Sequence, residues 1–148
     1  MLHVYEFEIF EDGGLFVALP FDFDGGTQGN TFADACEMAA DWLQVECEHR
    51  AMHEETFPKQ TFGNEPKNGG KVVIVAVNAD KDTVRKVKAS RAAELLGVTK
   101  GRVSQMVKAN QLEAFKDGGT VWVTLDSIEA RLAERPKAGR PAKTQVTA

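Results

Sequence analysis

The first part of this sequence lacks basic residues, and the whole chain is poor in cysteine. No lysine or arginine precedes Arg50, and only 2 cysteines occur among the 148 residues. Cys36 and Cys47 fall in a segment with helical periodicity, where a rise of 1.5 Å per residue separates them by about 16 Å. A disulfide between them is excluded at that distance. The chain therefore has no disulfide framework, and we expect reduced, partly buried thiols.

Long apolar runs are also missing. The longest, Val72–Val77, is far shorter than the roughly 20 residues that a membrane-spanning helix needs. The first ten residues contain Glu6 and Glu8, where a secretion signal would have lysines followed by an apolar stretch. We therefore expect a cytoplasmic protein with no membrane partner.

The charges that are present are divided unevenly along the chain. Residues 1–70 contain 3 Lys/Arg against 14 Asp/Glu, a net charge of −11, whereas residues 71–148 contain 15 against 8, a net charge of +7. Such asymmetry suggests two modules with different partners. Nucleic acid would repel the first module and attract the second.

The first module begins with strand patterns. Residues 4–10 alternate, with Tyr5, Phe7 and Ile9 on one face and two glutamates on the other, the period of a half-buried strand. The turn signal Asp12-Gly13 follows. A return strand is predicted at Leu15–Leu19, and a short third strand near Gly25–Gln28.

A helix and a further strand complete the first module. Thr31 is predicted to cap the helix, with Asp34 forming an approximate capping box. An apolar stripe with helical spacing then predicts the face that covers a sheet. It consists of Phe32, Ala35, Cys36, Ala39, Ala40, Leu43 and Cys47. The continuous run Val72–Val77 predicts a well-buried strand. We expect a β-β-β-α-β sheet with one covering helix over residues 1–78.

The second module has short helices and a hairpin. A polar linker is predicted at 79–87, and a helix at Ala89–Gly97 that ends in a glycine cap. Thr99 is predicted to cap the helix Lys100–Lys108, and Phe115–Val123 to form a hairpin. Asp126 and Glu129 are predicted to form a capping box for a last helix. The fold class is α+β, with a second domain at 88–135 and a disordered basic tail at 136–148.

The second helix of this module carries the candidate binding face. Val103, Met106 and Val107 are predicted to form its buried seam. The opposite face is polar and basic, and it includes Thr99, Lys100, Arg102, Ser104, Gln105 and Lys108. Glutamine can bond adenine and arginine can bond guanine in a bidentate manner, while lysines hold phosphates. Gly101 costs about 1 kcal/mol of helix propensity, so we expect either packing in the turn or close approach to DNA to require it.

The stretch AELLGVTKGRVSQMVKANQLEAFKDGGTVWVTLDSIEARL, with its order of helix, turn, capped helix, hairpin and helix, resembles the winged helix-turn-helix of the excisionase and MerR-like class. The resemblance implies that Arg102 and Gln105 read bases and that Lys116 contacts the DNA backbone near the wing. Gly139-Arg140-Pro141 resembles the core of an AT-hook, in which Arg140 would enter the minor groove. The alternative for the basic face is a solvated surface that packs on a protein partner.

The stretch YEFEIFEDGGLFVALPFDFDGGTQGNTFADACEMAADWL resembles the N-terminal domain of HicB-like antitoxins, which has a partial ribonuclease-H-like fold. The matching positions are Thr27, Gly29, Asn30, Thr31, Asp34 and Ala35. The resemblance implies an antitoxin and transcriptional repressor. Its acidic domain would bind a small basic RNA-cleaving toxin, and its basic domain would bind double-stranded operator DNA. We expect a homodimer or higher homo-oligomer.

Other functions stay open at this point. The runner-up is a stand-alone DNA-binding regulator, or an excisionase-like architectural protein, whose N-terminal domain oligomerises or senses a ligand. A nuclease would need converging carboxylates to hold two metals, and Asp22 and Asp24 alone do not supply them. His49 and His53 have the spacing of two metal ligands on one helix face, but they lack a second pair. We expect no enzyme activity, no metal and no cofactor.

Overall fold

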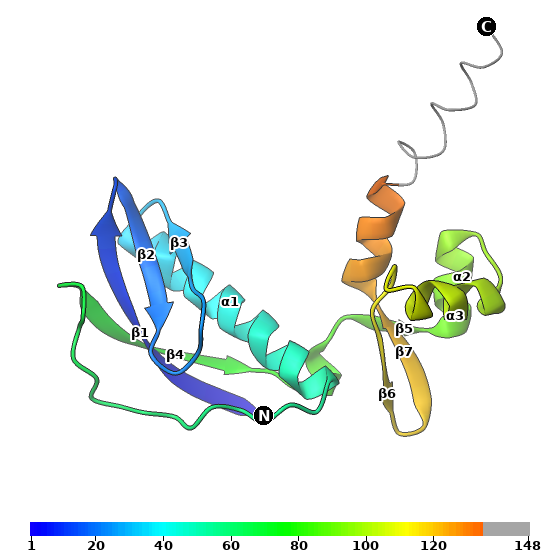
Figure 1. Cartoon of the computed structure of the whole chain (residues 1–148), viewed down its shortest axis with the longest axis horizontal. Coiled ribbons are helices and arrows are strands. Elements are labelled where there is room, and N and C mark those ends of the chain that lie inside the picture. The colour runs from blue at the N-terminus through cyan, green and yellow to red at the C-terminus, as the bar shows by residue number, and fades with distance from the viewer. Residues whose placement is uncertain (135–148) are drawn as a thin grey trace, which may run out of the picture. The chain divides into compact units, whose positions relative to one another are not determined.

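The computed structural model describes residues 1–134, and the chain divides into two compact units (Figure 1). Unit 1 is Met1–Thr83, and unit 2 begins at Val84. Each unit has its own apolar core. The fold is mixed α+β with antiparallel sheets, which confirms the α+β part of the predicted fold class. The expected tail 136–148, with Arg140, lies outside the described residues.

Unit 1 has a four-stranded antiparallel sheet with strand order β3-β2-β1-β4. Its elements follow one another as predicted, with one helix before the last strand. The strands are β1 (Leu2–Asp12), β2 (Leu15–Pro20), β3 (Thr27–Gly29) and β4 (Lys71–Asn78). The short third strand begins two residues later than expected.

Helix α1 (Phe32–Met52) covers one face of this sheet. Thr31 caps it as predicted, because its Oγ1 accepts the N–H of Asp34 at 3.0 Å, and the Asp34 carboxylate accepts the N–H of Asn30 at 2.8 Å. The buried positions of the helix include two alanines, which let it approach the sheet closely. They are Ala35, Ala39, Leu43 and Cys47. Phe32 is 37 % exposed and lies edge-on to Phe16 instead of in the core.

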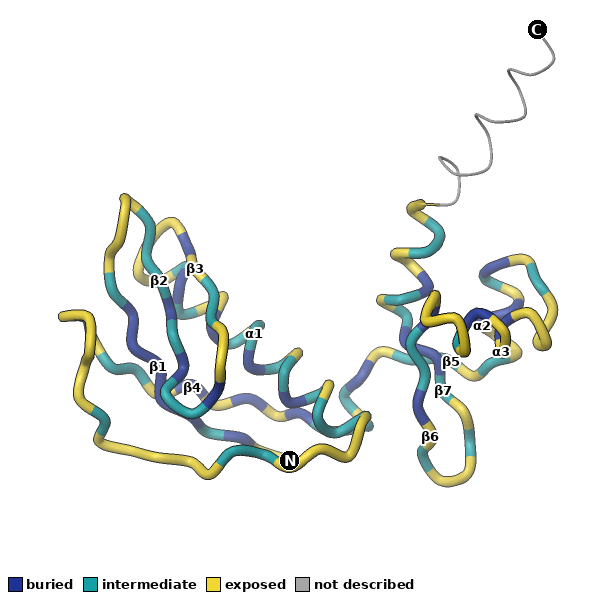
Figure 2. Tube along the Cα trace, viewed as in Figure 1, coloured by how far each residue is buried: buried dark blue, intermediate teal, exposed yellow. Residues whose placement is uncertain are grey.

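Strand β4 is less buried than the sequence predicts. It is the edge strand of the sheet, and its exposure alternates along the chain (Figure 2). Val75 and Val77 are buried, whereas the side chain of Ile74 is 64 % exposed. A run of β-branched residues does not reveal which face a partner layer covers, and only one face of β4 lies against α1.

In residues 84–134, unit 2 has a three-stranded antiparallel sheet with order β5-β7-β6 and three helical segments. Its strands are β5 (Lys86–Lys88), β6 (Ala114–Asp117) and β7 (Thr120–Thr124), and its helices are α2 (Ala89–Leu96), α3 (Lys100–Lys108) and residues 125–134. The stretch 79–87, expected as a linker, holds the 3-10 helix η1 (Lys81–Thr83) and the start of β5. Ala79 and Val84 within it are buried.

The cap of the last helix also differs from its prediction. Thr124, not Asp126, supplies the capping oxygen, because its Oγ1 accepts the N–H of Ser127 at 3.3 Å. Asp126 and Glu129 instead accept hydrogen bonds from the guanidinium of Arg85 at 2.9 and 3.0 Å. The predicted capping box is therefore wrong, because these carboxylates bind a side chain from another segment. Within residues 1–134, no helix is both long and apolar enough to cross a lipid bilayer.

Candidate nucleic-acid interface

The turn between α2 and α3 fixes the direction of α3. Gly97 ends α2 in the left-handed region, with φ of 70°, and the N–H of Val98 donates to the carbonyl of Ala93 at 3.0 Å. This is the glycine cap that the sequence predicts. Thr99 then caps α3, since its Oγ1 accepts the N–H of Arg102 at 3.1 Å.

Helix α3 packs through its apolar seam. Val103 and Met106 are 2 % and 4 % exposed and lie in the core of unit 2 with Leu96, Val123 and Ile128. Val107 is half-buried. The opposite face is therefore free for solvent or a ligand. Its exposed residues are Thr99, Lys100, Gly101, Arg102, Ser104, Gln105 and Lys108.

The charge on α3 is all of one sign. The helix contains Lys100, Arg102 and Lys108 and no carboxylate. Among residues 1–134, none of these three cations forms an ion pair, whereas Arg85 and Arg91 both bind carboxylates in the same unit. Two of the α3 cations lie in its first turn, where the helix dipole is positive, at a cost of about 0.3–1 kcal/mol each. An anion bound at this helix end would remove that repulsion.

The two candidate base-reading residues lie side by side. Nη1 of Arg102 is 3.4 Å from Oε1 of Gln105, one helical turn away. This long hydrogen bond holds both side chains on the exposed face without burying either. Both residues are exposed, so their remaining donors and acceptors are accessible to a ligand.

Packing does not explain Gly101. A Cβ at this position would meet only Oγ1 of Thr99, at 3.9 Å, which is ordinary contact distance. The residue is exposed, and its φ is not positive. Of the two reasons considered for this glycine, tight packing within the turn is therefore excluded, and close approach of an external surface is left.

The hairpin between β6 and β7 lies in the same unit as α3. Its turn residues Gly118 and Gly119 have φ of 62° and 81°, the combination that a two-residue turn of this type needs. Lys116 is exposed on β6, as its predicted role requires, and Asp117 at the turn is half-buried. On β7 the ring centroid of Trp122 lies 5.3 Å from Nζ of Lys86, which is a cation–π contact. Lys86 itself is half-buried.

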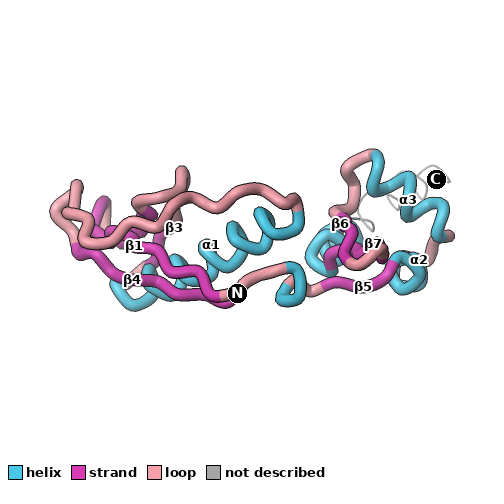
Figure 3. The backbone as a smooth tube through the Cα atoms, turned by 90° about the horizontal axis from the view of Figure 1, so that it is seen from below, coloured by secondary structure: helices cyan, strands magenta, loops and turns pink. Residues whose placement is uncertain are grey.

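Unit 1 uses part of its acidity internally. The carboxylate of Glu8, only 2 % exposed, accepts the N–H groups of Lys67, Asn68 and Gly70 at 2.9, 2.8 and 3.0 Å. Glu6, 5 % exposed, accepts the N–H groups of the loop segment 63–64 at 3.0 Å each. Residues 63–70 of the loop between α1 and β4 (pink in Figure 3) are thus held against the face of β1 opposite the helix.

These buried carboxylates were missed in the sequence. Alternation places Glu6 and Glu8 correctly on the second face of β1, but it predicts that they face water. The signal that could have revealed them is the later segment GNEPKNGG (63–70), since glycine leaves backbone N–H groups accessible and asparagine adds side-chain NH2 donors. Hydrogen bonds from Asn64 and Gly63 lower the pKa of Glu6.

Asp22 serves the same loop. Its Oδ2 accepts the N–H of Thr61 at 3.0 Å, and its Oδ1 accepts the Thr61 hydroxyl at 2.7 Å. Other carboxylates of unit 1 are exposed and have no hydrogen-bond or ion-pair partner within residues 1–134. They are Glu11, Asp12, Asp24, Glu37, Asp41 and Glu65. These residues lie on both sides of the sheet, on α1 as well as on the loops, and are together called the acidic surface below; each is open to a cationic partner.

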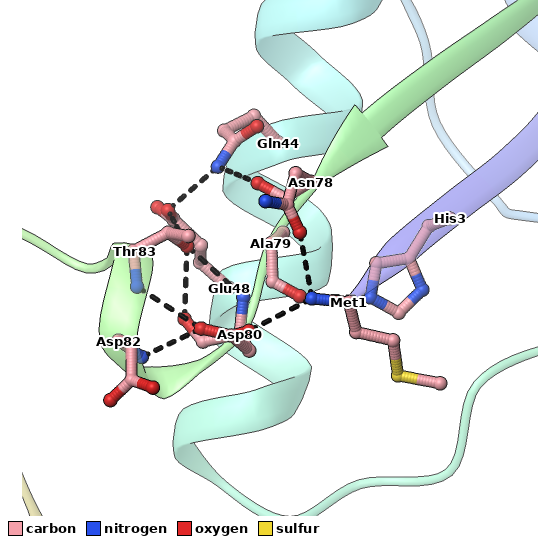
Figure 4. Close-up of polar contacts among 9 residues, drawn as sticks. All are labelled: Met1, His3, Gln44, Glu48, Asn78, Ala79, Asp80, Asp82 and Thr83. Carbon is pink, nitrogen blue, oxygen red and sulfur yellow. Dashed lines mark hydrogen bonds and ion pairs between the residues drawn. The ribbon is translucent and has the colours of Figure 1, made fainter.

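A polar cluster ties the end of unit 1 to α1 (Figure 4). The Thr83 hydroxyl donates to Glu48 at 2.6 Å, and Gln44 donates both to Glu48 at 2.8 Å and to the carbonyl of Asn78 at 3.0 Å. Asp80 accepts the N–H groups of Asp82 and Thr83 at 2.8 and 3.2 Å. The chain that follows β4 is therefore fixed to the helix as far as Thr83.

No protein-family model matches the sequence, and no curated protein matches it. Among solved structures, the chain is similar to one from a toxin-antitoxin complex of Streptococcus pneumoniae. The two are 14 % identical with a TM-score of 0.48, and the match covers 74 % of this chain and 99 % of the other.

Proposed function

We propose that this chain is a non-catalytic repressor of the antitoxin type. In this proposal unit 2 binds double-stranded operator DNA, and unit 1 binds a small basic toxin protein. The observation that carries the DNA-binding part is the exposed face of α3, where three cations stand without a carboxylate partner in the described chain. Such a face has its counter-charge outside the protein, and a DNA backbone supplies it.

In this proposal unit 2 acts as a winged helix-turn-helix. Helix α3 enters the major groove, and the β6–β7 hairpin is the wing. Arg102 and Gln105 read base edges, while Lys100 and Lys108 bind phosphates. Thr99 and Ser104 add hydroxyl contacts, and Lys116 meets the backbone from the wing. Gly101 allows the helix to approach the sugar-phosphate backbone closely.

The acidic surface supports the toxin-binding part. Its carboxylates are solvated and unpaired within the described residues, so a basic partner gains attraction without first breaking internal bonds. Attraction between surfaces of opposite charge speeds association and disfavours wrong partners. The same charge would keep unit 1 off DNA.

The arrangement of the carboxylates supports binding over catalysis. Glu6, Glu8 and Asp22 all accept hydrogen bonds from the loop between α1 and β4, and their oxygens face backbone N–H groups of that loop. A metal ion would have to compete with these donors. We therefore place no metal or cofactor in the proposed mechanism.

Operator binding is tested with the full chain and a site selected from random duplexes. Arg102→Ala and Gln105→Ala should each cost about 1–3 kcal/mol on the selected site and little on random DNA. Lys100→Ala is the matched comparison, because loss of a phosphate contact should weaken both DNAs alike and reduce the salt slope by about one. Equal losses on both DNAs for Arg102→Ala would contradict base reading.

Toxin binding is tested by using the full chain as bait in a lysate of the source cells. One small basic protein should be recovered at stoichiometric yield, and the yield should fall as salt is raised. The double variant Glu37→Lys, Asp41→Lys on the exposed side of α1 should recover less of it. Recovery of the chain alone would favour the stand-alone regulator instead.

A further inference from the structure

The outer edge of β4 is open for pairing. The strand pairs with β1 in an unbroken register from Leu2 opposite Asn78 to Ile9 opposite Lys71. No other segment in residues 1–134 pairs with its second edge. Between Val72 and Val77 there is no proline, no charge and no bulge. These are the features by which proteins usually block pairing at an edge strand.

We propose that two copies of this chain join through β4, edge to edge and antiparallel, so that their sheets become one. The strand is self-complementary for such pairing. With the two-fold axis at Ile74, Val73 lies opposite Val75 and Val72 lies opposite Ala76. The two residues of each pair are both odd-numbered or both even-numbered, so they lie on the same face of their strands. Core-facing side chains therefore meet core-facing ones, and helix α1 stays on the same side in both copies.

The side chains along this edge fit an apolar contact. Ile74 is 64 % exposed although it lies in the middle of β4, and Ala76 is also exposed. Leu2, 63 % exposed, lies on the same face of the neighbouring strand β1. Pairing at the two-fold axis brings the two Ile74 side chains together, which takes apolar surface out of water in both copies.

Charge favours a second copy over a basic protein as the occupant. The stretch 71–79 holds Lys71 and no carboxylate, so the edge offers nothing to attract a cationic partner. The acidic surface lies on other segments of unit 1. Residues 1–83 have 5 Lys/Arg against 16 Asp/Glu, a net charge of −11. Two copies therefore repel each other at long range, and added salt should strengthen their association.

The proposal does not depend on DNA or toxin binding, and sedimentation equilibrium of the full chain tests it. The wild-type chain should dimerise, with a dissociation constant that decreases as sodium chloride is raised. Ile74→Lys should weaken the dimer roughly tenfold or more, since it puts like charges opposite each other. The matched control is Val45→Lys, since Val45 is 65 % exposed but lies on α1 and not on β4. It should leave the dimer intact.

A cross-link provides the second readout. Ile74→Cys should form a covalent dimer under mild oxidation, because opposed Cβ atoms in a sheet can approach to about 4.5 Å, the upper end of the range that a disulfide spans. Val45→Cys should not. The native Cys47 is buried and Cys36 is half-buried, and the wild-type chain under the same oxidation gives their background. A wild-type chain that stays monomeric at high micromolar concentration, or a dimer that is indifferent to Ile74→Lys and gives no cross-link, would overturn the proposal.

Discussion

Replacing Glu8 by glutamine tests how the long loop is held to the sheet. The substitution keeps the shape of the side chain but turns one acceptor oxygen into an NH2 donor. Oε1 of Glu8 accepts from the N–H of Lys67 and from Nδ2 of Asn68, and Oε2 accepts from the N–H groups of Asn68 and Gly70. Whichever way the amide turns, two of these bonds lose their acceptor.

The size of the effect follows from those two bonds. A hydrogen bond to a charged group contributes about 1.5–3 kcal/mol, so the two together set an upper limit of about 3–6 kcal/mol. Lys67 and Asn68 are exposed, and their freed N–H groups can bond to water instead. We therefore expect Glu8→Gln to lower the free energy of unfolding by about 2–3 kcal/mol. Urea titration of the full chain measures it.

Glu11→Gln is the matched control. Glu11 lies on the same strand, but it is exposed and its carboxylate has no partner within residues 1–134, so the free energy of unfolding of Glu11→Gln should differ from that of the wild-type chain by less than about 0.5 kcal/mol. Hydrogen exchange at Lys67, Asn68 and Gly70 should accelerate in Glu8→Gln alone. Equal stability of the two variants, or unchanged exchange at these amides, would refute the conclusion that Glu8 holds the loop to the sheet.

The pH dependence of the free energy of unfolding tests the same contact. Burial acts to raise the pKa of Glu8, but the N–H groups of Lys67, Gly70 and Asn68 outweigh it, and the net pKa is lowered. The stability contributed by a group with a lowered pKa is present above its unfolded pKa, near 4.5, and is lost as the pH falls through the folded value. The wild-type chain should therefore lose stability in acid more steeply than Glu8→Gln.

Two further predictions concern α3 and the thiols. Gly101→Ala should stabilise unit 2 by about 1 kcal/mol in thermal unfolding, because its Cβ meets no close neighbour, yet it should weaken operator binding in a titration. A less stable Gly101→Ala variant would contradict the open space at this position, and unchanged operator binding would contradict the close approach to DNA. Burial raises the pKa of Cys47 to about 11, so a thiol reagent should modify it at neutral pH only after denaturant unfolds the chain. Rapid labelling of the native Cys47 would contradict that burial.

The parts of the fold that depend on local sequence were predictable. Thr31 and Thr99 cap their helices through the oxygen that a capping residue offers, and Gly97 takes the left-handed conformation that ends α2. The seam of α3 follows from the spacing of Val103 and Met106. Each of these signals lies within a few residues of the feature it determines, and no distant segment overrides it.

The parts that depend on distant segments were not predictable. Glu6 and Glu8 read as solvent-facing because their partners lie about sixty residues further along the chain. Asp126 and Glu129 read as a capping box because Arg85, which binds them, precedes them by about forty residues. In both cases a carboxylate binds a donor that sequence spacing alone does not identify.

The split in charge has a consequence for how the two proposed interactions combine. Salt screens the attraction between the α3 cations and phosphate, so operator binding by a single copy should weaken as salt is raised. Salt also screens the repulsion between two copies of unit 1, so pairing through β4 should strengthen. A dimer holds two copies of α3 on one particle, and the second DNA contact then becomes intramolecular. Ile74→Lys removes the dimerisation that offsets the loss of DNA affinity at high salt. Operator binding by this variant should therefore depend more steeply on salt than operator binding by the wild-type chain.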